Sequence, residues 1–135
     1  MITKVYLLDF SSNVEVHVLN SNQDGILQIA SILQGRNDLS SIQILSHGSN
    51  GSIAIGETTL NNSNLSSYSV ALQRIGSSLL ATGDILLYGC NVAKDESGLG
   101  FITQLANLTG ADVATSNNLT GFGGDWDLEG FKGDN

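Results

Sequence analysis

The chain has 135 residues, 41% of them hydrophobic, which is enough for one globular domain with its own core. A formal net charge of −8 disfavours nucleic acid or an anionic membrane surface as a partner, and basic segments are easier to accommodate. The single cysteine excludes an intramolecular disulfide, no run of 18 apolar residues predicts a membrane span, and no signal peptide is predicted.

Apolar residues recur along the chain with the periods of strands and helices. Strands are expected at residues 5–8, 14–18, 42–45, 53–55, 85–88 and 113–115. The expected helices run from Asn22 or Ser21 to Gly35, from Asn61 or Asn64 to Leu79, and from beyond Cys90 to Gly110. This alternation predicts an α/β fold with a mostly parallel sheet, right-handed crossovers and helices on both faces. Gly83 and Asp84 are expected to form a turn before the strand 85–88.

The link between the first two strands is an exception. Only residues 10–13 separate them, and a parallel crossover needs about a dozen residues, so these strands pair antiparallel or the first strand is displaced. One sheet face then lacks a cover, and apolar side chains there are expected to be exposed or buried by another chain, as in a homo-oligomer. The candidates for such exposure are Val5, Leu7, Val14, Val16 or Val18.

Two apolar strands stop at a reactive side chain next to a glycine. The strand 42–45 leads into Ser46-His47-Gly48, and the strand 85–88 leads into Gly89-Cys90-Asn91. The carboxyl ends of parallel strands share one edge of a sheet, so we expect His47 and Cys90 to meet there as base and nucleophile of a cysteine hydrolase. The alternative is a cysteine that is a small core residue and a histidine that belongs to a cap or turn.

These two motifs resemble the signatures of the caspase-like superfamily of cysteine peptidases. Five longer blocks are similar to an uncharacterised bacterial domain found near the amino terminus of large secreted or surface repeat proteins. The blocks are residues 46–48, 60–65, 88–93, 108–114 and 123–129. The resemblance implies a caspase-like three-layer α/β/α sandwich over residues 1–135, without the helix that related domains carry between their first two strands. It also implies that this domain is the N-terminal module of a longer secreted or cell-surface protein.

The resemblance further implies roles for individual residues. Cys90 would attack the peptide carbonyl, His47 would transfer protons, and the amides of Gly48 and Cys90 would hold the oxyanion. Neither a cofactor nor a metal is implied, and the substrate would be a peptide or protein, such as the parent protein itself. A catalytically silent binding module of the same fold is the alternative, because the first link and the segment after Gly121 are short.

Substrate-binding residues are expected near the dyad. Asp9 ends the first strand, where several caspase-like enzymes bind the residue on the acyl side of the scissile bond, and an aspartate there would favour Lys or Arg. A turn-forming aspartate explains the same position equally well. Ser46 and Asn91, which are the sequence neighbours of the dyad, are the other two candidates.

The remaining polar residues are given structural interpretations. His17 alternates with valines and is expected to be an exposed or edge-strand residue. Asp125, Asp127 and Glu129 do not reproduce a calcium-binding loop, so a solvated acidic strand end is preferred, with Trp126 in the core. A nucleotide-binding α/β domain is disfavoured, because no Gly-x-Gly-x-x-Gly run follows a strand.

Overall fold

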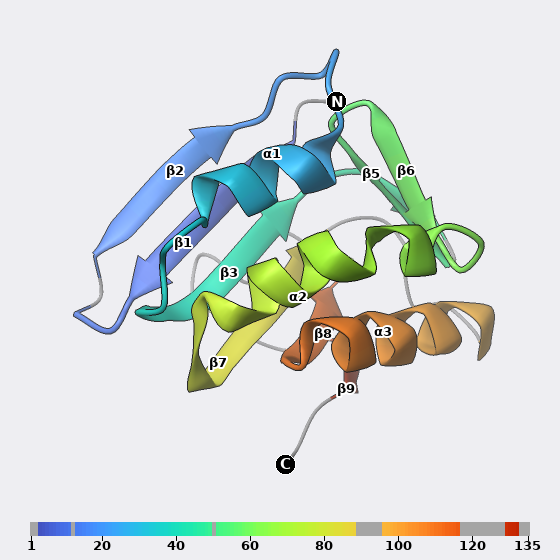
Figure 1. The fold of residues 1–135 in the computed structure, drawn as a ribbon. Coiled ribbons are helices and arrows are strands. Elements are labelled where there is room, and N and C mark those ends of the chain that lie inside the picture. The colour runs from blue at the N-terminus through green and yellow to red at the C-terminus, as the bar shows by residue number, and fades with distance from the viewer. Residues whose placement is uncertain (1–2, 12, 50, 89–95, 117–128, 133–135) are drawn as a thin grey trace.

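A six-stranded sheet forms the centre of the fold. The computed structural model describes residues 3–11, 13–49, 51–88, 96–116 and 129–132 (Figure 1). The strands lie in the order β2-β1-β3-β7-β8-β9. Their bounds are β1 Lys4–Asp9, β2 Val14–Val18, β3 Leu39–Leu45, β7 Leu79–Tyr88, β8 Asp112–Ser116 and β9 Glu129–Lys132.

The sheet is mostly parallel, as the sequence predicts. β3 pairs in parallel with β7, and β7 pairs in parallel with β8. β1 is antiparallel to both of its neighbours, and β9 is antiparallel to β8. Four strands, β2, β3, β7 and β8, therefore run in one direction, and their carboxyl ends share one edge.

The missing first crossover is confirmed. β1 and β2 form an antiparallel hairpin, which the Asp9 amide closes by donating to the carbonyl of Asn13 at 3.1 Å. No helix fits into a link of this length, so β1 runs against the direction of β3. This reversal determines at which edge of the sheet Asp9 lies.

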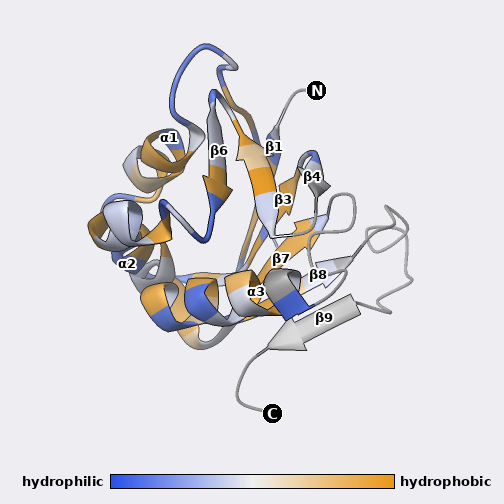
Figure 2. Ribbon diagram, turned by 90° about the vertical axis from the view of Figure 1, so that its right-hand side faces the viewer, coloured by the Kyte–Doolittle hydropathy of each residue, from blue (hydrophilic) through white to orange (hydrophobic). Residues whose placement is uncertain are grey.

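The three α-helices pack on one face of the sheet (Figure 2). Their bounds are α1 Gly25–Ile32, α2 Ser69–Ser77, which follows the 3-10 helix η1 Leu65–Tyr68, and α3 Glu96–Thr109. The steps from β2 to β3, from β3 to β7 and from β7 to β8 all proceed in the same direction across the sheet. Right-handed crossovers in one direction place their helices on the same side. The fold is of the expected mixed α/β class and is consistent with a three-layer sandwich. The expectation of helices on both faces is wrong for the described α-helices, which together form one outer layer.

The main core lies between this helical layer and the sheet. The predicted inward residues of the first helix, among them Ile26 and Ile29, are buried there in the same cluster as residues of β1 and β3. On the other face, Leu86, Tyr88 and Ala114 form a second buried cluster with Leu45 beside it.

The exposure expected from the short first link is confirmed, and it falls on the candidates in β2 and not on those in β1. Val14, Val16 and Val18 are 56%, 54% and 59% exposed. Val5 and Leu7 point to the opposite face, where the helices cover them.

Several element assignments differ from the predictions. Asp24, and not Asn22 or Ser21, caps α1, because its Oδ1 accepts from the amides of Ile26 at 2.9 Å and Leu27 at 3.2 Å. β7 begins at Leu79, so Gly83 and Asp84 lie within a strand and do not form a turn. Residues 48–61 form a second sheet of three strands, β4 Gly48–Ser49, β5 Ser52–Ile55 and β6 Thr58–Asn61.

Candidate active site

His47 lies just beyond the carboxyl end of β3. The last residue of β3, Leu45, is paired with Tyr88, the last residue of β7. The amide of Ser46 extends this pairing by donating to the carbonyl of Tyr88 at 2.9 Å. His47 is exposed, and its carbonyl accepts from the amide of Ala54 in β5 at 2.8 Å. The backbone of His47 is thus fixed between two sheets, while its side chain is open to solvent.

Ser46 is buried and engaged within the protein. Its hydroxyl lies 3.0 Å from that of Thr3 and donates to the carbonyl of Ala54. Thr3 also accepts from the amide of Gly56 at 3.3 Å. Ser46 is only 3% exposed, so the structure places it between the start of β1 and the turn of the small sheet. This placement makes Ser46 a structural residue and leaves its hydroxyl unavailable to a substrate.

The amide of Gly48 points away from the small sheet. Gly48 is paired with Ile53, and the amide of Ala54 donates to the carbonyl of His47. In an antiparallel ladder this bond flanks a residue pair that exchanges no hydrogen bonds of its own. Within the described part of the chain, no strand other than β5 pairs with β4. The Gly48 amide is therefore oriented towards the outer edge of β4 and does not bond to β5.

Cys90 and Asn91 lie outside the described residues. In the sequence, Cys90 follows Tyr88 by two positions, just as His47 follows Leu45 by two. The predicted meeting of His47 and Cys90 stays a prediction.

Asp9 and His47 lie at opposite ends of the parallel strands. It pairs with Leu39 at the amino end of β3, whereas Lys4 pairs with Leu45 at the carboxyl end. Six residue steps along a strand correspond to about 20 Å. The structure thus separates Asp9 from the residues with which it was expected to act, because β1 runs antiparallel to β3.

The turn interpretation of Asp9 is confirmed. Its Oδ1 accepts from the amides of Ser11 at 2.8 Å and Asn13 at 3.0 Å, and its Oδ2 accepts from the Asn13 side chain at 3.2 Å. Burial opposes ionisation of Asp9, but these hydrogen bonds outweigh it and lower the pKa of the carboxyl.

Comparison with known proteins gives one match. Residues 3–135 match a family described as a domain of unknown function, DUF4347. The chain belongs to the DUF4347 family. No curated protein and no solved structure matches it. Membership confirms the resemblance to an uncharacterised domain over nearly the whole chain.

A polar contact that the sequence does not predict joins two distant elements of this DUF4347 domain. The hydroxyl of Tyr68 donates to Oδ2 of Asp24 at 2.5 Å. Burial acts to raise the pKa of Asp24, but hydrogen bonds from Tyr68 and the α1 amides outweigh it and lower that pKa. The contact joins the start of α1 to η1 across 44 residues, which no local pattern could reveal.

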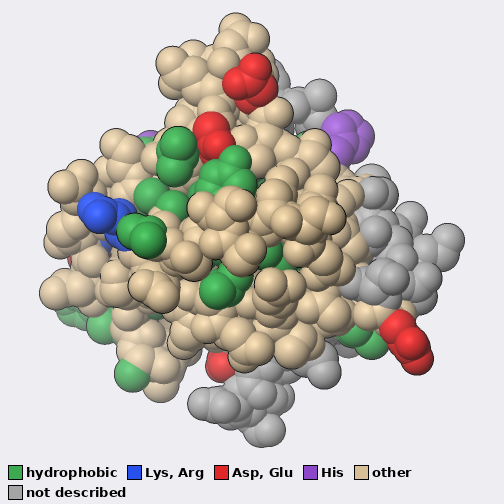
Figure 3. Space-filling view, turned by 45° about the vertical axis from the view of Figure 1, so that its right-hand side comes forward, with side chains coloured by type: hydrophobic (Ala, Val, Ile, Leu, Met, Phe, Trp, Pro, Cys, Tyr) green, Lys and Arg blue, Asp and Glu red, His purple; other side chains and the backbone are tan. Residues whose placement is uncertain are grey.

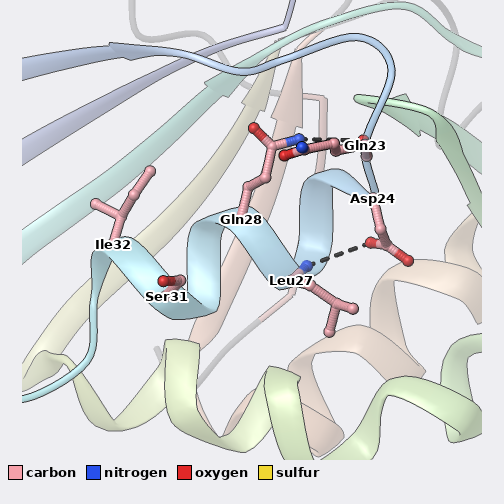
Figure 4. A pocket seen from close by; sticks show the side chains of 6 residues that line it. All are labelled: Gln23, Asp24, Leu27, Gln28, Ser31 and Ile32. Atoms are coloured by element: carbon pink, nitrogen blue, oxygen red, sulfur yellow. Dashed lines mark hydrogen bonds between the residues drawn. The ribbon is translucent and has the colours of Figure 1, made fainter.

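A hollow of about 510 Å³ lies along α1 (Figure 4). Gln23, Asp24, Leu27, Gln28, Ser31 and Ile32 line it. The Gln28 amide donates to the carbonyls of Asn20 at 2.8 Å and Gln23 at 3.0 Å, and Asp24 caps the helix. These polar groups of Gln28 and Asp24 are already paired within the protein, so they do not form a catalytic set in the hollow.

The described residues contain no group of three His, Cys, Asp or Glu side chains that could hold a metal ion. Asp125, Trp126 and Asp127 lie outside the described part, and Glu129 belongs to β9.

Among the described helices, none is long and apolar enough to cross a membrane. His17 lies on the edge strand β2 with its side chain 33% exposed, as predicted.

Proposed function

We propose that this chain is a caspase-like cysteine peptidase domain, with Cys90 as the nucleophile and His47 as the general acid and base. The register of β3 and β7 is the observation that supports the proposal. Leu45 and Tyr88 are paired at the ends of neighbouring parallel strands, and the two reactive residues follow them at equal sequence distance. Neighbouring strands lie about 4.8 Å apart, so the chain leaves the sheet at adjacent points before each reactive residue.

The chemistry follows from this pair. His47 accepts the thiol proton of Cys90, and the thiolate attacks the peptide carbonyl to form a tetrahedral oxyanion. The outward amide of Gly48 and the amide of Cys90 stabilise this charge. The C–N bond then breaks, and His47 donates the proton to the leaving amine. Water, deprotonated by His47, hydrolyses the resulting thioester and restores the thiol.

The proposed substrate is a peptide or protein segment, and the parent protein of a secreted or surface assembly is one such substrate. Basic segments are favoured because the chain carries a net charge of −8. In the face shown in Figure 3, the coloured Lys, Arg, Asp and Glu side chains lie scattered and form no broad basic patch. Asp9 plays no part in this selectivity, because it lies at the other edge of the sheet.

Labelling of the only cysteine tests the dyad directly. A thiol with the ordinary pKa of about 8.5 is only about 1% thiolate at pH 6.5, and a neighbouring base raises its reactivity there. We expect Cys90 to react readily with iodoacetamide at pH 6.5 and His47→Gln to slow this reaction about tenfold or more. Mass spectrometry of the intact chain follows the reaction, and Cys90→Ala gives the background.

The second histidine provides a matched control. His17 lies in β2 and is partly exposed, so His17→Gln removes the same group without touching the site. Its labelling rate should equal that of the unmodified sequence. Fluorogenic peptides with Lys, Arg or Asp before the cleaved bond then test for turnover, which Cys90→Ala and His47→Gln should abolish. If His47→Gln does not change labelling and no peptide is cleaved, the peptidase proposal is wrong and the silent binding module replaces it.

A further inference from the structure

β2 is an exposed edge strand of the sheet, with apolar side chains on one face. β2 is the last strand of the sheet on this side, and no described strand other than β1 pairs with it. Val14, Val16 and Val18 are each more than half exposed and share the face of the sheet opposite the helices. Such an edge is a template for pairing with another strand.

The backbone groups of the same valines point outwards. In the β1–β2 hairpin, the amide of Leu19 donates to Thr3 at 3.0 Å and that of Asp9 donates to Asn13 at 3.1 Å. Hydrogen-bonded pairs alternate along an antiparallel ladder, so Glu15 and His17 are the residues of β2 that bond to β1. The amides and carbonyls of the three valines are therefore directed towards the free edge.

The β2 sequence is complementary to itself in one antiparallel register. With Val16 opposite Val16 of a second copy, Val14 faces Val18, and each of these pairs can exchange two backbone hydrogen bonds. The same register places Glu15 opposite His17 on the other face, twice by symmetry. A shift of one residue would place valine opposite Glu15 or His17, and a shift of two would place Glu15 opposite Glu15 or His17 opposite His17.

We propose that two copies of this chain pair through β2 about a twofold axis at Val16, which joins their sheets into one. Backbone hydrogen bonds, an apolar strip of six valines and two Glu15–His17 pairs support this dimer. Glu15 already contacts Arg36 at 2.9 Å and His17 of its own chain at 3.3 Å, so its carboxylate is held at this edge. The proposal does not depend on the chemistry of Cys90.

Net charge opposes the dimer, because each copy carries −8. This repulsion acts over the whole surface and is screened at moderate salt, where the Debye length is about 8 Å. The strand contacts act at short range and persist there. Association is thus expected to be weak at low ionic strength and stronger near 0.5 M salt.

A cysteine at the symmetry axis tests the register. In a Cys90→Ser background, Val16→Cys places two thiols opposite one another, with Cα atoms about 5.5 Å apart, which is within the range of a disulfide. We expect mild oxidation to convert most of this variant into a covalent dimer on a non-reducing gel. Val14→Cys is the matched control, since Val14 is equally exposed on the same face and lies about 14 Å from its own copy in this register.

A second measurement avoids the introduced thiols. Sedimentation velocity at up to about 0.5 mM protein should show a reversible dimer in the unmodified chain, and Val16→Lys should weaken it at least tenfold. Val70→Lys, at a 73% exposed position on α2, should leave the dimer unchanged. A monomer at every concentration would overturn the proposal. Equal cross-linking of the Val16→Cys and Val14→Cys variants would do so as well.

Discussion

Ser46 and His47 are neighbours with opposite surroundings, and this contrast predicts separate effects of mutation. The buried hydroxyl of Ser46 bridges Thr3 and the carbonyl of Ala54. Ser46→Ala leaves both partners with a lost hydrogen bond, so we expect the free energy of unfolding to fall by about 1–3 kcal/mol. Urea unfolding followed by circular dichroism measures this change.

Ser67→Ala is the control for this prediction, because Ser67 is exposed in η1. Its effect should stay within about 0.5 kcal/mol. If the two alanine variants unfold at the same urea concentration, the Ser46 bridge does not stabilise the protein.

Whether a residue lies at the carboxyl or the amino ends of the parallel strands could be predicted only where the direction of its own strand was certain. His47 and Gly48 follow a strand with helical crossovers, so their place at the carboxyl edge was predictable from periodicity alone. Asp9 was expected at the same edge, but the short link reverses β1 relative to its neighbours. Burial of Ser46 depends on Thr3, which lies 43 residues away, and no local pattern contains that contact.

At the scale of elements, α2 and α3 approach closely at a glycine. A Cβ atom added at Gly76 would overlap the backbone carbonyl of Thr109, at the end of α3. Neither helix can give way easily, because both pack on the sheet. We expect Gly76→Ala to lower the free energy of unfolding by about 2–4 kcal/mol in a thermal or urea melt.

Gly100 offers the opposite case on α3. A Cβ atom there would meet nothing within 4 Å. Alanine has the higher helix propensity, so Gly100→Ala should raise the free energy of unfolding by about 0.5–1 kcal/mol. If Gly100→Ala also lowers the free energy of unfolding, the close helix packing at Gly76 does not explain the effect of Gly76→Ala.

The long buried elements were more predictable than the short ones. Strands β3 and β8 and the inward face of α1 follow directly from runs and periods of apolar residues. β6, with the sequence Thr-Thr-Leu-Asn, has only one apolar side chain, so its pairing with β5 leaves almost no sequence pattern. The start of β7 was predicted as helix, because Leu79 continues the apolar period of α2.

At the scale of the whole molecule, folding lowers the pKa of some carboxyl groups and raises that of another. Hydrogen bonds from Arg36 and His17 lower the pKa of Glu15, and hydrogen bonds also lower those of Asp9 and Asp24 despite opposition from burial. Groups of this kind add stability above their ordinary pKa, and that stability is lost as the pH falls. The free energy of unfolding should therefore decrease in acid.

The pKa of Asp84 shifts in the opposite direction. Burial, and then the charge of Asp112 on the neighbouring strand, raises the pKa of its carboxyl. The folded chain thus binds this proton more tightly than the unfolded chain, and stability is lost as the pH rises through the raised pKa. Asp84→Asn removes this loss, so we expect it to raise the melting temperature at pH 7 and to have little effect near pH 3. Glu57→Gln removes one charge from an exposed side chain and is the control for net charge. If both variants raise the melting temperature equally at pH 7, relief of the overall negative charge explains the gain, and the partly buried position of Asp84 does not.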